Sequence, residues 1–390
     1  MALLIAGGGI GGLATALALA SHDLDVHVIE KASAFGEIGA GIQLAPNASW
    51  ALDRLGVLDA VHEHAVFPSR IAWMDAESGQ PLTSLDLGDS FRGRYGYNYL
   101  VMHRSDLLNA LLARCRAHPR IRLETDKDVI RIEESAESTT VQCADGSSYR
   151  TELLIGADGL WSTVRAHLVG DGEPECSRYV AYRGAIPISE ISTHAGLDSV
   201  MLWTGPDMHL VQYPVRRGEL YNQVAVFKSE RYRPGTDDWG TPDEMDAHFG
   251  RGAELVRSAL TKIKRNRRWP MYDRLPTTTW SRNRVVLLGD AAHPMLQYLA
   301  QGAAQALEDS VVFGDAIAAH GIDDGVTAYE RERQPRTARV QTLAREWGEY
   351  WHLHDGPART ARDGYLRARA PEDYQESDWF YGYAPTFSRR

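Results

Sequence analysis

Residues 2–30 decide the fold and read ALLIAGGGIGGLATALALASHDLDVHVIE. Leu3–Ala6 is apolar at every position, as expected of a strand that is buried on both faces of a parallel sheet. A glycine cluster comes next, then a helix that we predict from about Gly11 to Ser21, and then a second apolar strand at Val26–Ile29. Strand, turn, helix and strand in this order are the beginning of a doubly wound α/β sheet.

The glycine cluster matches the pattern G-x-G-x-x-G, with Gly7, Gly9 and Gly12 at the defining positions. Glycine lets a backbone approach a pyrophosphate, and the N-terminus of the next helix supplies unpaired N–H donors. Glu30, 18 residues after Gly12, ends the next strand and can accept hydrogen bonds from ribose hydroxyls. The glycines alone could form a turn that binds nothing, but the whole arrangement predicts a dinucleotide site.

The rest of the chain alternates between two kinds of sheet. Buried strands at 153–156 and 284–290 return to the first sheet, and a long helix follows Gly302. Between them, 208–214 and 221–227 read as strands of an antiparallel sheet. We therefore predict a Rossmann-like dinucleotide-binding domain at 1–176 and 276–340, an inserted antiparallel β-sheet substrate domain at 177–275, and an aromatic, partly helical C-terminal segment at 341–390 that packs on the body or on a partner subunit.

The composition argues against several classes of protein. With 44% hydrophobic and 24% charged residues, the 390-residue chain has the composition of a globular protein. No apolar run approaches the roughly 20 residues of a transmembrane helix, and a net charge of -10 argues against nucleic acid as a partner. Cys115, Cys143 and Cys176 are far apart, without metal-ligand spacing, so we expect reduced thiols, a cytoplasmic location and no metal site.

Two more motifs follow predicted buried strands: Gly156–Gly159, with Ser162 and Arg165 after it, and Gly289–Pro294. Together with the first glycine motif, they stand in the order found in the single-component (class A) flavoprotein aromatic hydroxylases. Over essentially its whole length the chain resembles that family, which includes para-hydroxybenzoate hydroxylase. The resemblance implies that the bound dinucleotide is FAD, and it assigns flavin contacts to Arg104, Asp290 and Gly302. It implies a dual role in flavin and nicotinamide binding for Asp158 and Gly159.

Only one glycine fingerprint is present. By resemblance, NADH, or alternatively NADPH, visits transiently without a Rossmann domain of its own. The family reduces FAD with this cosubstrate, captures O2 as a flavin hydroperoxide and transfers one oxygen to an electron-rich ring. A phenol reacts better as its phenolate, and because free phenols have a pKa of about 10, a nearby base lowers the barrier.

His209, Val211 and Tyr213 should project from one face of a single strand, because strand side chains alternate. In an arbitrary strand these would be a core histidine and a packing tyrosine. The resemblance instead implies that His209 is the base or proton relay and Tyr213 a hydroxyl that polarises the substrate. It assigns Gln297, where many relatives carry proline, to orienting the phenol.

Several segments resemble the branch of the family that hydroxylates 3-hydroxybenzoate para to its hydroxyl group, giving gentisate (2,5-dihydroxybenzoate). The same chemistry on another small aromatic acid, such as salicylate or a hydroxypyridine carboxylate, stays open. So do an NAD-dependent dehydrogenase and a non-catalytic dinucleotide-binding scaffold. The family also implies a homodimer, and Arg183 is a candidate for binding the substrate carboxylate, although an arginine beside a strand is as often structural. The segments that resemble the branch acting on 3-hydroxybenzoate are residues 91–96, 209–213, 269–273, 296–300 and 347–353.

Overall fold

A computed structural model describes residues 2–36, 40–191, 196–383 and 385. Its first sheet has six strands, and all neighbours pair in parallel except the edge strand β17. The predicted strands at 3–6, 26–29 and 153–156 lie in it, and the one predicted at 284–290 is shorter, at 285–287, which confirms the doubly wound sheet. In spatial order the strands are β17 (Ser281–Arg282), β18 (Val285–Leu287), β11 (Leu154–Gly156), β1 (Leu3–Ala6), β2 (Val26–Ile29) and β7 (Ile121–Glu124).

Helix α1 (Ile10–Ala20) packs tightly between this sheet and α9 (Gly302–Trp351), and all but one of its residues are buried. Small side chains permit this close packing, since a Cβ on Gly314 would lie 2.8 Å from the Cβ of Ala18. The other helices in the first 170 residues are α2 (Pro46–Arg54), α3 (Leu58–His62), α4 (Asp89–Tyr95), α5 (Arg104–Arg116) and α6 (Thr163–Leu168). Two small antiparallel sheets join β8 (Val129–Glu134), β9 (Thr139–Cys143) and β10 (Ser148–Thr151), and β3 (Gly41–Leu44) with β6 (Leu100–His103).

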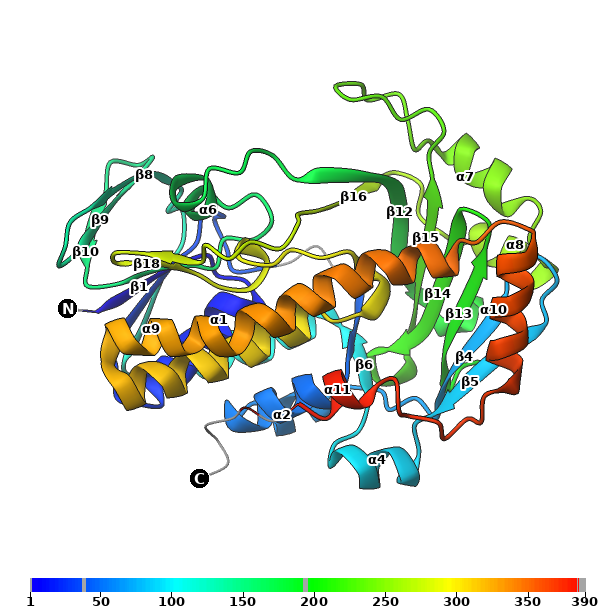
Figure 1. Ribbon diagram of the computed structural model, residues 1–390, viewed down its shortest axis with the longest axis horizontal. Helices are drawn as coiled ribbons and strands as arrows, with labels where there is room; N and C mark the ends of the chain where they lie inside the picture. The colour runs from blue at the N-terminus through cyan, green and yellow to red at the C-terminus, as the bar shows by residue number, and fades with distance from the viewer. Residues whose placement is uncertain (1, 37–39, 192–195, 384, 386–390) are drawn as a thin grey trace.

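The second large sheet lies at the opposite end of the molecule (Figure 1). Its strands pair antiparallel except at β13–β4, which is parallel. The predicted boundaries 177–275 omit β4 and β5. The strand β4 pairs with β13, about 130 residues later in the chain, and the sequence near either strand does not indicate this pairing. In spatial order the strands are β16 (Trp269–Asp273), β12 (Glu175–Pro187), β15 (Leu220–Lys228), β14 (Met208–Val215), β13 (Ser199–Gly205), β4 (Arg70–Asp75) and β5 (Pro81–Asp86). Helices α7 (Pro242–Phe249) and α8 (Glu254–Leu260) follow β15.

Helix α9 reverses direction at Gly321, whose φ is +76°. Arg333 donates hydrogen bonds to Asp309 and Gln305, residues that would lie about 36 and 42 Å away along a straight helix. The first half therefore lies beside the second, and the second half runs from the first sheet to the second (Figure 1, orange). The predicted boundary at 341 falls inside this half.

The C-terminal segment packs on the body of the same chain. Trp347, Tyr350 and Trp351 surround Trp73 of β4, with ring centroids 6.0–6.1 Å apart. Beyond α10 (Pro357–Ala368), the short α11 (Asp378–Tyr381) brings the ring of Tyr381 against Phe91. Residues 384 and 386–390 of the predicted segment lie outside the described residues. Within the described part of the chain, no helix is long and apolar enough to cross a membrane.

Candidate active site

A cavity of about 950 Å³ is lined both by the glycine turn after β1 and by one face of the seven-stranded sheet. Every predicted site residue except Gly12 lines it. The residues that the structure brings together are Gly7, Gly9, Glu30, Arg104, Asp158, Gly159, His209, Tyr213, Asp290, Gln297 and Gly302.

The glycine turn has the geometry of a pyrophosphate cradle. Gly7 has φ +109°, and a Cβ there would lie 2.3 Å from the carbonyl oxygen of Ala157. A Cβ on Gly12 would lie 1.9 Å from the carbonyl oxygen of Gly7, so Gly12 acts outside the cavity by letting α1 pack against the turn. A Cβ on Gly9 would meet nothing within 4 Å. The backbone at Gly9 is therefore open to a ligand at the N-terminus of α1.

Glu30 lies at the carboxyl end of β2, where ligands bind in doubly wound sheets. Its Oε2 accepts a hydrogen bond from the Gly8 N–H at 2.7 Å, and its Oε1 accepts one from the Ala32 N–H at 2.9 Å. These contacts hold the carboxylate at the cavity wall. Each oxygen keeps a lone pair that can accept a ribose hydroxyl.

The second and third motifs are tied to each other. Asp158 accepts hydrogen bonds from the Ser162 hydroxyl and the Val164 N–H, so it caps the turn into α6, and burial raises its pKa. The buried guanidinium of Arg165 donates to the carbonyl oxygens of Ala291 and Ala292 at 3.0 and 2.7 Å. Asp158 thus makes the cap contact of a strand-end turn and also lines the cavity.

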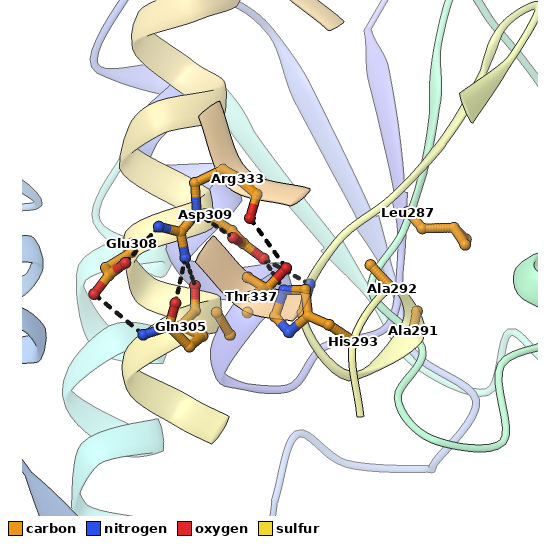
Figure 2. Close-up of polar contacts among 12 residues, drawn as sticks. Leu287, Ala291, Ala292, His293, Gln305, Glu308, Asp309, Arg333 and Thr337 are labelled. Carbon is orange, nitrogen blue, oxygen red and sulfur yellow. Dashed lines mark hydrogen bonds and ion pairs between the residues drawn. The ribbon is translucent and has the colours of Figure 1, made fainter. Parts of the chain in front are cut away.

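A buried ionic network holds the loop of the third motif from behind. Figure 2 shows Arg333 reaching Glu308, Asp309 and Gln305 at once, and Asp309 also contacts His293 Nε2 at 2.5 Å. Asp309 accepts a further bond from the backbone N–H of Gly289 at 3.1 Å. Burial alone would raise the pKa of Asp309, but His293 and Arg333 lower it to about 2. The loop therefore rests on a buried scaffold in which Asp309 stays ionised at neutral pH.

The strand β14 presents His209, Val211 and Tyr213 to the cavity, as predicted from strand alternation. Four residues of strand span about 13 Å, so the two polar side chains stand at opposite ends of a patch large enough for one small ring. Burial raises the pKa of Tyr213. A Cβ on Gly41 would lie 2.7 Å from the Tyr213 hydroxyl, so glycine at that position leaves room for it.

The floor between these two polar groups is apolar. The register places Trp73, Leu202, Val211 and Val224 in one row across four strands, and all four line the cavity. Arg183 continues the row on β12, with its guanidinium 4.6 Å from the centroid of the Trp269 ring. The arrangement suits an aromatic ring that carries polar groups at its rim, with one cation within reach.

The imidazole of His209 is completely buried. Its Nδ1 lies 2.8 Å from Nε2 of His352, and among the described residues its Nε2 has no hydrogen-bond partner. Burial lowers the pKa of His209 to about 3, so the ring is neutral at physiological pH. A neutral imidazole has one nitrogen that can accept a proton.

Sequence reasoning missed several residues of this site. His352 lies 143 residues from its partner His209, and no local pattern links the two. Tyr298, next to Gln297, packs 5.5 Å from the His209 ring, and glycine at 348 makes room for it, since a Cβ there would lie 2.5 Å from the tyrosine ring. The tail residues 375–377 and 379–381 also line the cavity.

Known proteins resemble the chain over most of its length. Residues 1–344 match the family described as FAD binding domain. The 3-hydroxybenzoate 6-hydroxylase of Klebsiella oxytoca is 39% identical over 98% of this chain and 97% of its own. The 6-hydroxynicotinate 3-monooxygenase of Bordetella bronchiseptica is 34% identical over 88% and 90%. The structure of HpxO from Klebsiella pneumoniae, complexed with FAD and uric acid, has a TM-score of 0.84 at 27% identity, covering 97% of this chain and 95% of that one.

Proposed function

The chain belongs to the family of FAD-dependent aromatic-ring monooxygenases, and on that premise we propose that it converts 3-hydroxybenzoate to gentisate with NADH and O2. The observation that carries this proposal is the neutral, buried imidazole of His209 at the rim of an apolar floor. The relatives named 3-hydroxybenzoate 6-hydroxylase supply the substrate, because they match nearly the whole chain.

The residues of the first lobe fit FAD. The open backbone at Gly9 suits the pyrophosphate, Glu30 the ribose, and Arg104, Asp290 and Gly302 the remaining part of the cavity. When bound, FAD takes a hydride from the nicotinamide and activates O2 for transfer to the ring.

The substrate sheet supplies the acid–base chemistry and the positioning. His209 Nε2 accepts the proton of the substrate hydroxyl, which makes the ring a stronger nucleophile. Gln297 in the 3₁₀ turn η4 (Gln297–Leu299) orients the same hydroxyl, and Tyr213 polarises the other end of the substrate. The row from Trp73 to Val224 holds the ring and excludes water.

The same site also suits a hydroxypyridine carboxylate. The Bordetella relative, named for 6-hydroxynicotinate, favours this second candidate. A pyridine ring has the same size as a benzene ring, and its carboxylate could equally approach Arg183.

The purified yellow protein decides between these substrates. We would follow NADH oxidation with 3-hydroxybenzoate, 6-hydroxynicotinate and salicylate in parallel, and identify each product by chromatography. Gentisate formed in equal amount to the NADH consumed supports the proposal. Peroxide release without gentisate contradicts the proposal. A stoichiometric hydroxylated product from one of the other acids identifies that acid as the substrate instead.

The proposal also includes a cytoplasmic homodimer. Light scattering coupled to size-exclusion chromatography measures the mass directly, against the 43.3 kDa of one chain.

A further inference from the structure

Two histidines on different elements form a hydrogen-bonded pair behind the cavity. His209 comes from β14, and His352 follows the last residue of α9. Their rings lie 5.1 Å apart at an interplanar angle of 25°, with Nδ1 of His209 2.8 Å from Nε2 of His352. Among the described residues, the two outer nitrogens, His209 Nε2 and His352 Nδ1, have no hydrogen-bond partner. The pair thus has one shared bond and two open ends.

The surroundings keep both rings neutral. Burial lowers the pKa of His352 well below its usual value, and His209, Lys228 and Arg362 lower it further. Aromatic rings enclose the pair: Tyr179 stacks on His352 at 4.6 Å, and Trp351 meets His209 edge-on at 5.1 Å. Neither ring can therefore hold an extra proton at neutral pH.

A neutral pair has two tautomeric arrangements. If His209 donates from Nδ1, its Nε2 is an acceptor toward the cavity. If His352 donates from Nε2, then His209 carries its proton on Nε2 and is a donor toward the cavity. The first arrangement suits a phenol, and the second suits a phenolate.

We propose that His352 is a positioning residue that couples the tautomer of His209 to its own and completes a two-ring proton relay from the cavity. The inference rests on the hydroxylation proposed above. It adds a role for His352, which the names of the relatives do not address. Its basis is the shared bond with an open nitrogen at each end.

The relay leaves both rings neutral. The substrate O–H bond breaks and a bond forms from that proton to His209 Nε2, while the proton on His209 Nδ1 passes to His352 Nε2. The proton on His352 Nδ1 leaves to water. The substrate becomes a phenolate, which accepts a hydrogen bond from the new N–H of His209, and the pair changes from its first arrangement to its second.

The far end of the pair lies close to a polar surface. His352 is 4% exposed, and Tyr179, which stacks on it, contacts Asp207 through its hydroxyl at 3.3 Å. Asp207 also pairs with Lys228 at 3.3 Å. The proposal places the exit of the proton on the side of this polar group, away from the cavity.

Two substitutions at one position separate hydrogen bonding from packing. His352→Phe keeps an aromatic ring against Tyr179 but has no nitrogen, whereas His352→Gln loses the ring and keeps an amide that can reach His209 Nδ1. His354→Gln is the matched control, because His354 is two residues away and its side chain is 69% exposed. All variants and the wild type are compared as FAD-loaded protein.

The first readout is coupled turnover of 3-hydroxybenzoate. In His352→Phe we expect product formation to fall about 10- to 100-fold, KM to change less than about threefold and peroxide release to rise. His352→Gln should recover only part of the rate, because its amide can hold the His209 tautomer but cannot pass a proton on, and His354→Gln should match the wild type. A wild-type rate and yield in His352→Phe overturns the proposal. Equal losses in both His352 variants, together with a lower Tm, also overturn it, because they assign His352 to packing.

The second readout needs no turnover. In nitrogen-15 spectra of histidine-labelled, substrate-free holoprotein, the hydrogen-bonded Nδ1 signal of His209 should vanish in His352→Phe and persist in His354→Gln. An unchanged spectrum in His352→Phe overturns the relay. If the wild type makes no hydroxylated product from 3-hydroxybenzoate, the proposed function fails, and these spectra alone support or overturn the pair.

Discussion

The ionic network lies behind the loop of the third motif, Gly289–Pro294, and the histidine pair lies behind the apolar floor of the cavity. Both clusters are buried, but the network is charged whereas the pair is neutral. In the network, the side chains of His293, Glu308, Asp309 and Arg333 are 0% exposed, and Arg333 compensates the charges of Glu308 and Asp309. In the pair, each open ring nitrogen lacks any hydrogen-bond partner among the described residues, and burial keeps both rings neutral.

This difference indicates that the charged network holds the structure in place, whereas the neutral pair can take part in proton transfer. A compensated charge network loses several kcal/mol when one partner is removed, so it holds a loop in one place. A neutral pair can exchange a proton without changing its net charge. A loop that has to keep one position needs the first property, and a site that removes a phenol proton, as we propose, needs the second.

The largest expected effect comes from breaking the network. Asp309→Asn leaves Arg333 with one carboxylate fewer and should lower the free energy of unfolding by about 3–5 kcal/mol and release FAD. Urea unfolding and flavin fluorescence measure the two losses. The control is Asp323→Asn, whose side chain is 76% exposed and pairs with Arg284 on the surface, so the change should stay below about 1 kcal/mol. Equal stability of the two variants would show that the network is not a scaffold.

The next effect concerns the pair itself. His209→Ala should slow hydroxylation about 100-fold and raise peroxide release while FAD stays bound, because the base is lost and the flavin lobe is untouched. Product and peroxide are measured per NADH consumed. Met208→Leu, on the opposite face of β14, conserves volume and serves as the control. Unchanged coupling in His209→Ala removes this residue from the mechanism.

The two clusters should lose stability in different pH windows. The pKa of His209 is about 3 when folded and about 6.5 when unfolded. The unfolded chain therefore gains a proton first, and stability falls as the pH drops below about 6.5. The pKa of Asp309 is about 2 when folded and about 3.9 when unfolded, so its contribution is lost only below about pH 4.

Melting temperatures recorded across this pH range check both windows. His209→Gln should flatten the profile between about pH 6 and 4, and Asp309→Asn should flatten it below about pH 4. A His209→Gln profile that parallels the wild type would contradict the assignment of the upper window.

The smallest effect on stability belongs to Asp290, an exposed residue that lines the cavity in the same loop as the network. Asp290→Ala should lose FAD while the free energy of unfolding of the apoprotein changes by less than about 0.5 kcal/mol. Absorbance of the purified protein gives the FAD content. A fully yellow variant would falsify the flavin contact of Asp290.

Much of the fold was predictable because its signals are local. The apolar run at 3–6, the glycine motif and the strands at 208–214 and 221–227 each carry their own period or turn chemistry, and the structure confirms them. The placement of β4 beside β13 was not predictable, because a parallel pairing between distant segments leaves no mark in either one. The reversal of α9 at Gly321 was also missed, since a single glycine is compatible with a continuous helix.

The sequence by itself determined the dinucleotide lobe, the residues that line one cavity, and the face of β14 that carries His209 and Tyr213, because motif spacing and strand alternation act over a few residues. Only the tertiary structure decided which side chains from distant parts of the chain contact the cavity wall from the side away from the cavity. His352 reaches His209, and Arg333 reaches Asp309, across long stretches of chain. Whether a buried polar group is charged or neutral depends on the partners that folding brings to it, and a sequence read locally does not contain them.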